Sequence, residues 1–308
     1  MKASPECLIC ILEDVYGAVK TARGEKPRED VRLLTEVMKM LHEEFSLEKP
    51  PNYYITKAHR VLKRMTGIED PYRETKSYCN KVGLEIASKV KAEAQALPAE
   101  KRLTRFVRYA IAGNLLDFRT AGISYDFDES RIENWLQQEA DGKLTIDDTD
   151  KIVEKAMRSR SILYVADNVG EIAFDRILVE ELVSCGSYVV VAVKGLPITS
   201  DATTQDAEEV GMTKVASKII LSGMDTLGVV FREAEKEFLE EFEKADLIIS
   251  KGQANYYAIS ERQERGGIAF LLTTKCECAA ESFGVHGKVS IAKYIDSFGK
   301  QSEEEALR

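Results

Sequence analysis

The side chains best suited to metal chemistry stand where an apolar run of the sequence ends. Residues 161–166 form a strand-like run, and Asp167 and Asn168 follow it directly. An open α/β sheet carries its chemistry at the carboxyl ends of its strands. Two polar residues that end a buried strand need partners, and a divalent metal ion supplies them. Glu171 follows in the first turn of the next expected helix, where it either complements the helix dipole or joins the same site.

A second loop rich in oxygen ligands follows one βα unit later. Residues 196–203 read Leu-Pro-Ile-Thr-Ser-Asp-Ala-Thr and include Asp201. Because this loop follows a neighbouring strand end, Asp201 is predicted to ligate the same ion as Asp167 and Asn168. Asp206 is better placed to cap the next helix. Oxygen ligands of this type suit magnesium or manganese, with cobalt or nickel as substitutes.

A cation and a second polar pair add to this pattern. Lys251 ends the apolar run 247–250, and Asn255 lies one turn further on. Acidic ligands on two strand ends and a cation on a third indicate a metal ion that holds a phosphate. On an earlier apolar helix, Asn114 and Asp117 lie one turn apart and point in one direction. This pair marks either a shared polar cavity or a hydrogen-bonded contact in the core or at a helix end.

The composition indicates a soluble globular protein with a substantial core. The chain has 308 residues, of which 44% are hydrophobic and 31% are charged. A formal charge of −9 argues against nucleic-acid binding, which needs a clustered basic face. No apolar run approaches the roughly 20 residues that span a bilayer, and the first residues do not resemble a secretory leader. We therefore expect a cytoplasmic protein without a nucleic-acid or membrane partner.

Six cysteines in a chain of this length do not form the pattern of a disulfide framework. Cys7 and Cys10 form a C-x-x-C pair, and Cys276 and Cys278 form a C-x-C pair. On a helix, the first pair shares a face, so buried packing is one interpretation. A redox pair, or a metal or disulfide clip through Cys79, is the other interpretation.

The sequence predicts two parts that differ in their periodicity. Residues 1–158 show helical periodicity and few strand signals, whereas apolar runs and helical segments alternate in residues 159–308. Continuous Val, Ile and Leu runs between helices imply an α/β fold with a mostly parallel sheet that is covered on both faces. The first part is expected to pack on the second. The expected strands are residues 162–166, 188–193, 218–221, 247–250 and 268–272.

Several of these segments together resemble the damage-control phosphatase family, which includes the acidic-residue-methyltransferase-like proteins and was long a domain of unknown function. The C-x-x-C pair and residues 70–73 with Lys76 are similar to its prokaryotic branch. The resemblance covers nearly the whole chain, and five short motifs in register are much more specific than one. These motifs are Ala112-Gly113-Asn114 with Asp117, residues 167–171, residues 197–206, residues 251–256, and Thr274-Lys275-Cys276.

The resemblance implies a helical N-terminal region on a three-layer α/β/α Rossmann-like sheet. It also implies a metal-dependent phosphatase that acts on small phosphorylated metabolites, such as sugar phosphates or damaged forms. The implied metal ligands and catalytic residues match Asp167, Asn168 and Asp201. The residues implied to bind phosphate or other substrate groups match Asn114, Asp117, Glu171, Lys251, Asn255 and Lys275.

Two positions depart from the family pattern, and two other functions remain open. Ala254 stands where glycine is common, and Tyr257 stands where an acidic residue is common. One alternative is a carboxyl methyltransferase that uses S-adenosylmethionine, although residues 167–171 lack the glycine-rich turn of a dinucleotide fold. The other is a phospho-metabolite binding protein without turnover. The oligomeric state and the general base, for which Asp201 and Glu171 are both candidates, stay open as well.

Overall fold

One seven-stranded sheet organises the computed structural model, which describes residues 2–117, 129–260, 262 and 267–296. The strand order is β1-β7-β6-β5-β2-β3-β4. All neighbouring strands are parallel except β6 and β7, which pair antiparallel. The strands are β1 (Ile146–Asp147), β2 (Ser161–Val165), β3 (Tyr188–Lys194), β4 (Lys218–Gly223), β5 (Leu247–Lys251), β6 (Gly267–Thr273) and β7 (Ser290–Ile295).

Helices account for most of the remaining described chain. Local signals set many of their ends: Pro27 and Pro51 occupy first helical positions, and Gly67 ends a helix in the left-handed conformation. The helices before the second strand are α1 (Glu6–Arg23), α2 (Pro27–Glu44), α3 (Pro51–Thr66), α4 (Arg73–Ala94), α5 (Ala99–Ala112), η1 (Gly113–Leu116), α6 (Glu129–Asp141) and α7 (Thr149–Arg158). Those after it are α8 (Glu171–Ser184), α9 (Thr204–Glu209), η2 (Met212–Lys214), α10 (Lys236–Lys244), α11 (Gln253–Ile259) and α12 (Glu277–Ser282).

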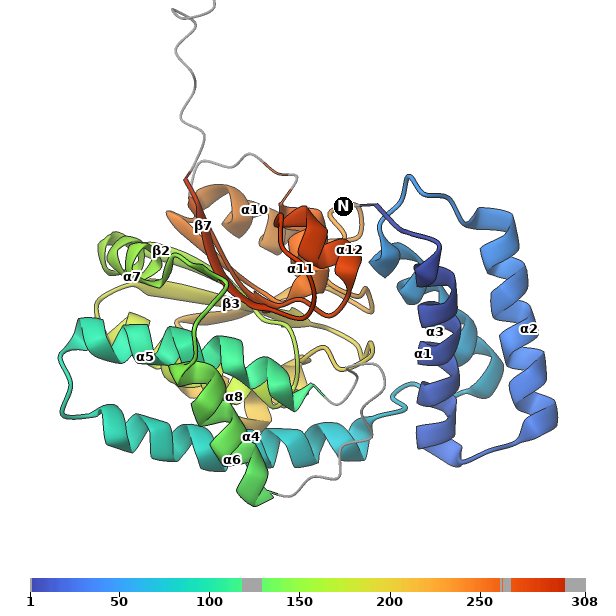
Figure 1. The fold of residues 1–308 in the computed structure, drawn as a ribbon, viewed down its shortest axis with the longest axis horizontal. Coiled ribbons are helices and arrows are strands. Elements are labelled where there is room, and N and C mark those ends of the chain that lie inside the picture. Colours follow the sequence, from blue (N-terminus) through green and yellow to red (C-terminus); the bar gives the residue numbers. More distant parts are fainter. Residues whose placement is uncertain (1, 118–128, 261, 263–266, 297–308) are drawn as a thin grey trace, which may run out of the picture.

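The sheet is the middle of three layers. Successive strand residues point to opposite faces, so Ile162 and Tyr164 join one apolar cluster while Leu163 and Val165 join another. The first cluster includes residues of helices α4 to α9, and the second includes residues of α10 to α12. Figure 1 shows these helices on the two sides of the sheet. The mostly parallel α/β/α fold expected from the sequence is confirmed.

Helices α1 to α3 form a separate N-terminal helical lobe with its own apolar core, built around residues such as Val15, Val37 and Tyr54. In Figure 1 this lobe lies beside the sheet and its covering helices. Helix α3 connects it to the loops that follow β3 and β4. Lys63 Nζ donates to the Pro197 carbonyl at 2.7 Å, and Asn52 Nδ2 donates to the Leu227 carbonyl at 3.0 Å. None of the helices in the described part of the chain is long and apolar enough to span a bilayer.

The division of the chain is finer than the two predicted parts. Helices α4 to α7 lie before residue 158 but share the sheet's apolar core, whereas the N-terminal helical lobe has its own. Strands β1 and β7 were not predicted, and they pair with each other at one edge of the sheet. The five predicted strands are all present, with ends shifted by no more than two residues.

The order of the strands reverses direction between two of them. Strand β2 pairs with β3 on one side and with β5 on the other, and the chain proceeds outward in opposite directions from that point. The connections after β2 and β5 therefore diverge at the carboxyl ends of these strands. In open α/β sheets, ligands bind at such a switch point.

Candidate active site

The loops after β2 and β3 are joined by backbone hydrogen bonds, which bring their polar side chains together. Asn168 and Asp201 form an isolated antiparallel bridge. Val169 N donates to the Ser200 carbonyl at 2.9 Å, and Ala202 N donates to the Asp167 carbonyl at 2.8 Å. The three predicted metal ligands, Asp167, Asn168 and Asp201, are therefore neighbours, and each is at most 4% exposed.

The side-chain amide of Asn168 is held in one orientation. Its Nδ2 donates to Asp167 Oδ2 at 2.5 Å and to Glu171 Oε2 at 3.1 Å. Its Oδ1 accepts from Ser200 Oγ at 2.8 Å, which leaves a second lone pair on this oxygen. The nitrogen thus faces the carboxylates, and the oxygen is free to take a second partner such as a cation.

Asp201 lies in a constrained loop above a buried lysine. Thr199 has a φ of 47°, the one positive φ among the described residues other than glycine. Gly228 N donates to Asp201 Oδ2 at 3.3 Å, and Lys194 Nζ lies 3.9 Å from the same oxygen. Lys194 also donates to the Gly228 carbonyl at 2.5 Å. Burial lowers the pKa of Lys194, while the charge of Asp201 opposes that shift.

Lys251 lies beneath this cluster instead of in the open part of the site. Its side chain is fully buried, and its Nζ donates to Glu171, to Asp175 at 2.7 Å and to the Ala110 carbonyl at 2.8 Å. Three partners use all three hydrogens of an ammonium group. The family resemblance implied that Lys251 binds phosphate. In the structure, Lys251 instead balances two carboxylates and has no hydrogen left for a substrate.

Lys275 is the cation on the accessible side. Its Nζ forms an ion pair with Asp117, and its side chain is 26% exposed while Asp117 is buried. The charges of Asp117 and Asp167 outweigh burial and raise the pKa of Lys275, which keeps it protonated. Asn114 Nδ2 donates to Glu171 Oε2 at 3.1 Å from the short helix η1. The Asn114–Asp117 pair therefore joins a shared polar site, which was one of the two interpretations of the sequence.

Asn255 connects the ends of β2 and β5. Its Nδ2 donates to the Ala166 carbonyl at 3.0 Å and to the Lys251 carbonyl at 2.9 Å. Its Oδ1 is buried and makes no hydrogen bond within the described residues. This oxygen is available to a ligand, so substrate contact by Asn255 stays a prediction.

The electrostatics of the cluster favour a bound cation. Burial raises the pKa of Asp167 well above its usual value; Lys275 opposes that shift, and the negative charges of Asp201, Glu171 and Asp117 add to it. A divalent ion would reverse the balance by pairing with these carboxylates. The available donors are carboxylate and amide oxygens, which suit a hard cation. Asp167, Asn168 and Asp201 thus fit the metal that the sequence predicted.

Gly252 allows strand β5 to approach this cluster closely. Its φ is 74°, and a Cβ atom at this position would lie 1.8 Å from Asp167 Oδ2. Two conditions therefore favour glycine here: a left-handed backbone and the absence of space for a side chain.

We expect Gly252→Ala to lower hydrolytic activity by roughly 10²-fold, because the new methyl group displaces the Asp167 carboxylate. Gly67→Ala is the matched control, since Gly67 has a φ of 70° and open space around its Cβ position. Both variants incur about 1–2 kcal/mol of backbone strain. Steady-state assays and thermal melts of the two variants separate strain from displacement. Equal activity in both would contradict the proposed contact.

Asp206 caps helix α9, as the sequence favoured. Its Oδ2 accepts from Thr203 N at 2.8 Å, and its backbone N donates to Thr203 Oγ1 at 3.5 Å, which together form a capping box. Its Oδ1 accepts from Asn80 Nδ2 at 2.9 Å, and Asn80 Oδ1 accepts from Gly170 N. Asp206 therefore supports the loop that carries Asp167 and Asn168 through Asn80.

Sequence reasoning missed three charged neighbours of the site. Lys194 follows an apolar strand in the same way as Lys251, so the same signal could have found it. Asp175 lies four residues after Glu171 on helix α8, and this spacing places both on one helix face. Lys288 is exposed and close enough to Lys275 for that charge to lower its pKa, after the larger effect of burial. Nothing in the sequence near Lys288 signals this proximity.

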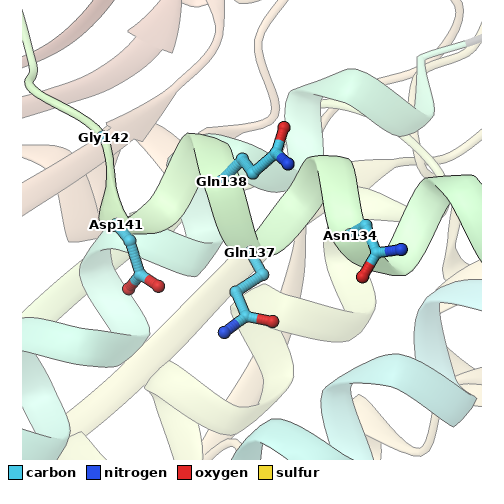
Figure 2. A pocket seen from close by; sticks show the side chains of 5 residues that line it. All are labelled: Asn134, Gln137, Gln138, Asp141 and Gly142. Carbon is cyan, nitrogen blue, oxygen red and sulfur yellow. The ribbon is translucent and has the colours of Figure 1, made fainter.

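A surface hollow of about 470 Å³ lies elsewhere, along helix α6. Figure 2 shows its lining residues, Asn134, Gln137, Gln138, Asp141 and Gly142, on one stretch of that helix. It contains none of the predicted site residues. The side chains predicted from the sequence to carry the chemistry lie away from this hollow, at the switch point of the sheet.

Comparison with known proteins identifies the family of this chain. The profile of the damage-control phosphatase ARMT1-like domain matches residues 3–289. An uncharacterized protein of Methanocaldococcus jannaschii, MJ0202, is 35% identical, with 92% of this chain and 93% of that protein aligned. A damage-control phosphatase of Archaeoglobus fulgidus is 33% identical, with 96% and 100% aligned. The damage-control phosphatase PH1575 of Pyrococcus horikoshii is also 33% identical, with 92% and 95% aligned.

The fold agrees as well. The crystal structure of a DUF89 family protein of Pyrococcus horikoshii, PH1575, superimposes with a TM-score of 0.86 at 31% sequence identity. The match covers 96% of this chain and 99% of that structure. With a family profile over nearly its whole length and relatives above 30% identity, this chain belongs to the damage-control phosphatase family.

Proposed function

We propose that this protein is a metal-dependent phosphatase that hydrolyses small phosphorylated metabolites. The observation that carries the proposal is the meeting of Asp167, Asn168 and Asp201 at the switch point of the sheet, with the accessible Lys275 beside them. Membership of the damage-control phosphatase family supports it. The family name suggests reactive or damaged phosphate esters, including sugar phosphates, as the substrate class.

Three side chains would hold the metal. Asp167 and Asp201 offer carboxylate oxygens, and Asn168 offers the amide oxygen whose orientation Glu171 and Ser200 fix. A bound divalent ion such as Mn²⁺, Ni²⁺, Co²⁺ or Mg²⁺ would polarise a phosphoryl oxygen and position a water molecule. The protein's contribution is to gather these oxygens in a site from which bulk water is largely excluded.

Lys275 is the side chain best placed to bind the phosphate. It is protonated, partly exposed and close to the predicted metal ligands. A cation at this position would balance the negative charge that grows on the phosphoryl oxygens during transfer. Asp117 would keep the Lys275 ammonium directed toward the site until a phosphate competes for it.

Glu171 serves as an anchor in this arrangement. It accepts hydrogen bonds from Lys251, Asn114 and Asn168, so both of its carboxylate oxygens are engaged by buried donors. These contacts fix the amide of Asn168 and tie helix α8 to the end of β5. Of the two candidates for the general base, Asp201 is consequently the better one.

The direct test is phosphate release from a broad panel of phosphate esters after metal removal and re-addition. We expect hydrolysis of aryl phosphates and of some sugar or damaged metabolite phosphates with at least one of Mn²⁺, Ni²⁺, Co²⁺ and Mg²⁺. No phosphate release with any of these ions would refute the proposal. Binding of phosphate esters without single-turnover release would indicate a metabolite-binding protein. Tight binding of S-adenosylmethionine in the presence of a chelator would favour the methyltransferase alternative.

We expect Lys275→Met to lower kcat/KM by roughly 10–100-fold, because the substrate phosphate loses its balancing charge. Metal binding should persist, since the three proposed ligands are untouched. Lys293→Met, a change on the nearby strand β7, is a control with near-normal kinetics. Unchanged kcat/KM in Lys275→Met, with metal binding measured in parallel, would exclude Lys275 from the phosphate site.

A further inference from the structure

Two short cysteine motifs that the proposed reaction does not use come together at the junction between the N-terminal helical lobe and the sheet. Cys7 and Cys10 lie in the first turns of helix α1. Cys276 is the N-cap of helix α12, and Cys278 lies in its first turn. The pairs are separated by more than 260 residues in the sequence, so only the fold makes them neighbours. Figure 1 places the amino terminus between α12 and the lobe.

Contacts of the amino-terminal segment connect the two pairs. Cys278 Sγ donates to the Lys2 carbonyl at 3.6 Å. Two residues later, Ser4 N donates to Cys7 Sγ at 3.4 Å, and the Ser4 hydroxyl lies 3.6 Å from the same sulfur. The short segment from Lys2 to Ser4 thus has one sulfur from each pair against it.

Cys276 makes weak contacts that a metal–sulfur bond could replace. Cys276 Sγ lies 3.4 Å from Gln253 Nε2 and 3.9 Å from the Tyr257 hydroxyl. Both distances are typical of weak sulfur hydrogen bonds, because sulfur is a poor donor and a poor acceptor. Exchange of such contacts for metal–thiolate bonds would cost little.

Cys278 is close to a sulfur of each pair. Both Cys276 and Cys7 are near enough to influence its thiol electrostatically. The sulfurs of the two motifs therefore meet at the same junction.

We propose that Cys7, Cys10, Cys276 and Cys278 bind one thiophilic divalent ion of the zinc type, separate from the oxygen site. Four thiolates in two close pairs are the usual donor set of a tetrahedral structural zinc site. In this structure the four sulfurs are not yet gathered: among the described residues, the group of three or more ligand-type side chains with donor atoms within 4.8 Å of one another is Glu277, Glu281 and His286. The cysteine sulfurs would reach ligand distance as their weak contacts are exchanged for bonds to the ion.

The other two cysteines are not part of this site. Cys79 lies on α4 beside Gly170, within the support of the active-site loop. Cys185 Sγ lies 3.9 Å from Glu181 Oε1 at the end of α8. The clip through Cys79 considered from the sequence is therefore replaced by one through Cys276 and Cys278.

The proposed ion would fasten helix α1 to the loop that carries Lys275. Cys276 directly follows Lys275, and Lys275 N donates to Gln253 Oε1 at 2.7 Å. The ion would thus hold the N-terminal helical lobe against the phosphate side of the active site. Its role would be structural, because four protein ligands leave no open position for a substrate.

The experiment measures metal in the full-length protein purified under reducing conditions without added chelator. We expect about one zinc ion per chain, as for a closed structural site, and replacement by cobalt should give the intense thiolate charge-transfer bands of tetrahedral sulfur coordination. The same measurements on Asp167→Asn remove the contribution of the oxygen site. The proposal would be overturned if Asp167→Asn contains no bound metal and the cobalt-substituted protein shows no thiolate charge-transfer bands.

Matched variants assign the ligands. Zinc should be lost in Cys7→Ser/Cys10→Ser and in Cys276→Ser/Cys278→Ser, and it should remain in Cys185→Ser. The first double variant should melt at a lower temperature but hydrolyse phosphate esters nearly normally at saturating divalent metal. Zinc retained in either double variant would exclude those thiols as ligands.

A measurement on the unmodified chain covers the case in which the double variants do not fold. Alkylation followed by mass spectrometry should show these four cysteines protected in the presence of zinc and reactive after its removal. A disulfide between any two of them in the freshly purified reduced protein, without zinc, would overturn the proposal. Unchanged alkylation with and without zinc would do so too.

Discussion

Asp167→Asn should lower phosphatase activity at subsaturating metal by on the order of 10³-fold, because the change removes a ligand charge. The side chain keeps its size and can still pair with the Asn168 amide. In the wild type, burial raises the pKa of Asp167, because a buried carboxylate charge is unfavourable without a metal ion. Asparagine carries no charge, so the metal-free variant should be as stable as the wild type.

The decisive measurement combines activity with metal-dependent melting. Divalent metal should raise the thermal midpoint of the wild type by binding the folded state, and it should do so far less in Asp167→Asn. Asp246→Asn is the matched control, because Asp246 accepts from Arg160 N and Ser161 N at the opposite end of strand β2. Near wild-type hydrolysis by Asp167→Asn at subsaturating metal would contradict the ligand assignment.

Lys251→Met should have the largest effect on stability. The change leaves Glu171 and Asp175 buried without their cation, and breaking a buried ion pair in this way costs about 3–5 kcal/mol. Lys218→Met is the control, because Lys218 pairs with Glu237 where both side chains are substantially exposed. Loss of such a surface pair should cost at most about 1 kcal/mol in urea-induced unfolding.

The pH dependence gives this prediction a second test. Burial raises the pKa of Asp175 to about 6 even though Lys251 opposes that shift. A carboxyl whose pKa is raised in the folded state destabilises the fold as pH rises from about 4 through that value, because the unfolded chain ionises more readily. Without Lys251 this effect should grow, so the loss in the variant should be greatest above pH 6 and smaller near pH 4. A loss independent of pH would show that packing, and not charge, explains the destabilisation.

Much of the fold follows from local patterns. Runs such as 162–166 and 247–250 are apolar on both faces because their strands are buried on both sides, and this made them easy to recognise. Strand β7 was missed because Lys293 interrupts its short apolar run, Ser-Ile-Ala-Lys-Tyr-Ile, and because it pairs antiparallel with β6 beside the short edge strand β1. A two-residue strand such as β1 has no periodicity to detect.

The sequence alone determined which side chains end the strands, and therefore which could carry the chemistry. Asp167, Asn168 and Asp201 were identifiable because polar groups after buried strands need partners. The helix-capping role of Asp206 was also a local property, fixed by the spacing from Thr203.

The tertiary structure decided which of the two lysines after the strands is buried and which can meet a substrate. Lys251 and Lys275 look alike in the sequence, but the packing of α8 against β5 surrounds Lys251 with carboxylates and leaves Lys275 partly exposed. It also decided that Cys7 approaches the segment next to Cys278 and not Cys79. These outcomes depend on contacts between distant segments, and a local pattern holds no information about which distant charge or sulfur will be its neighbour.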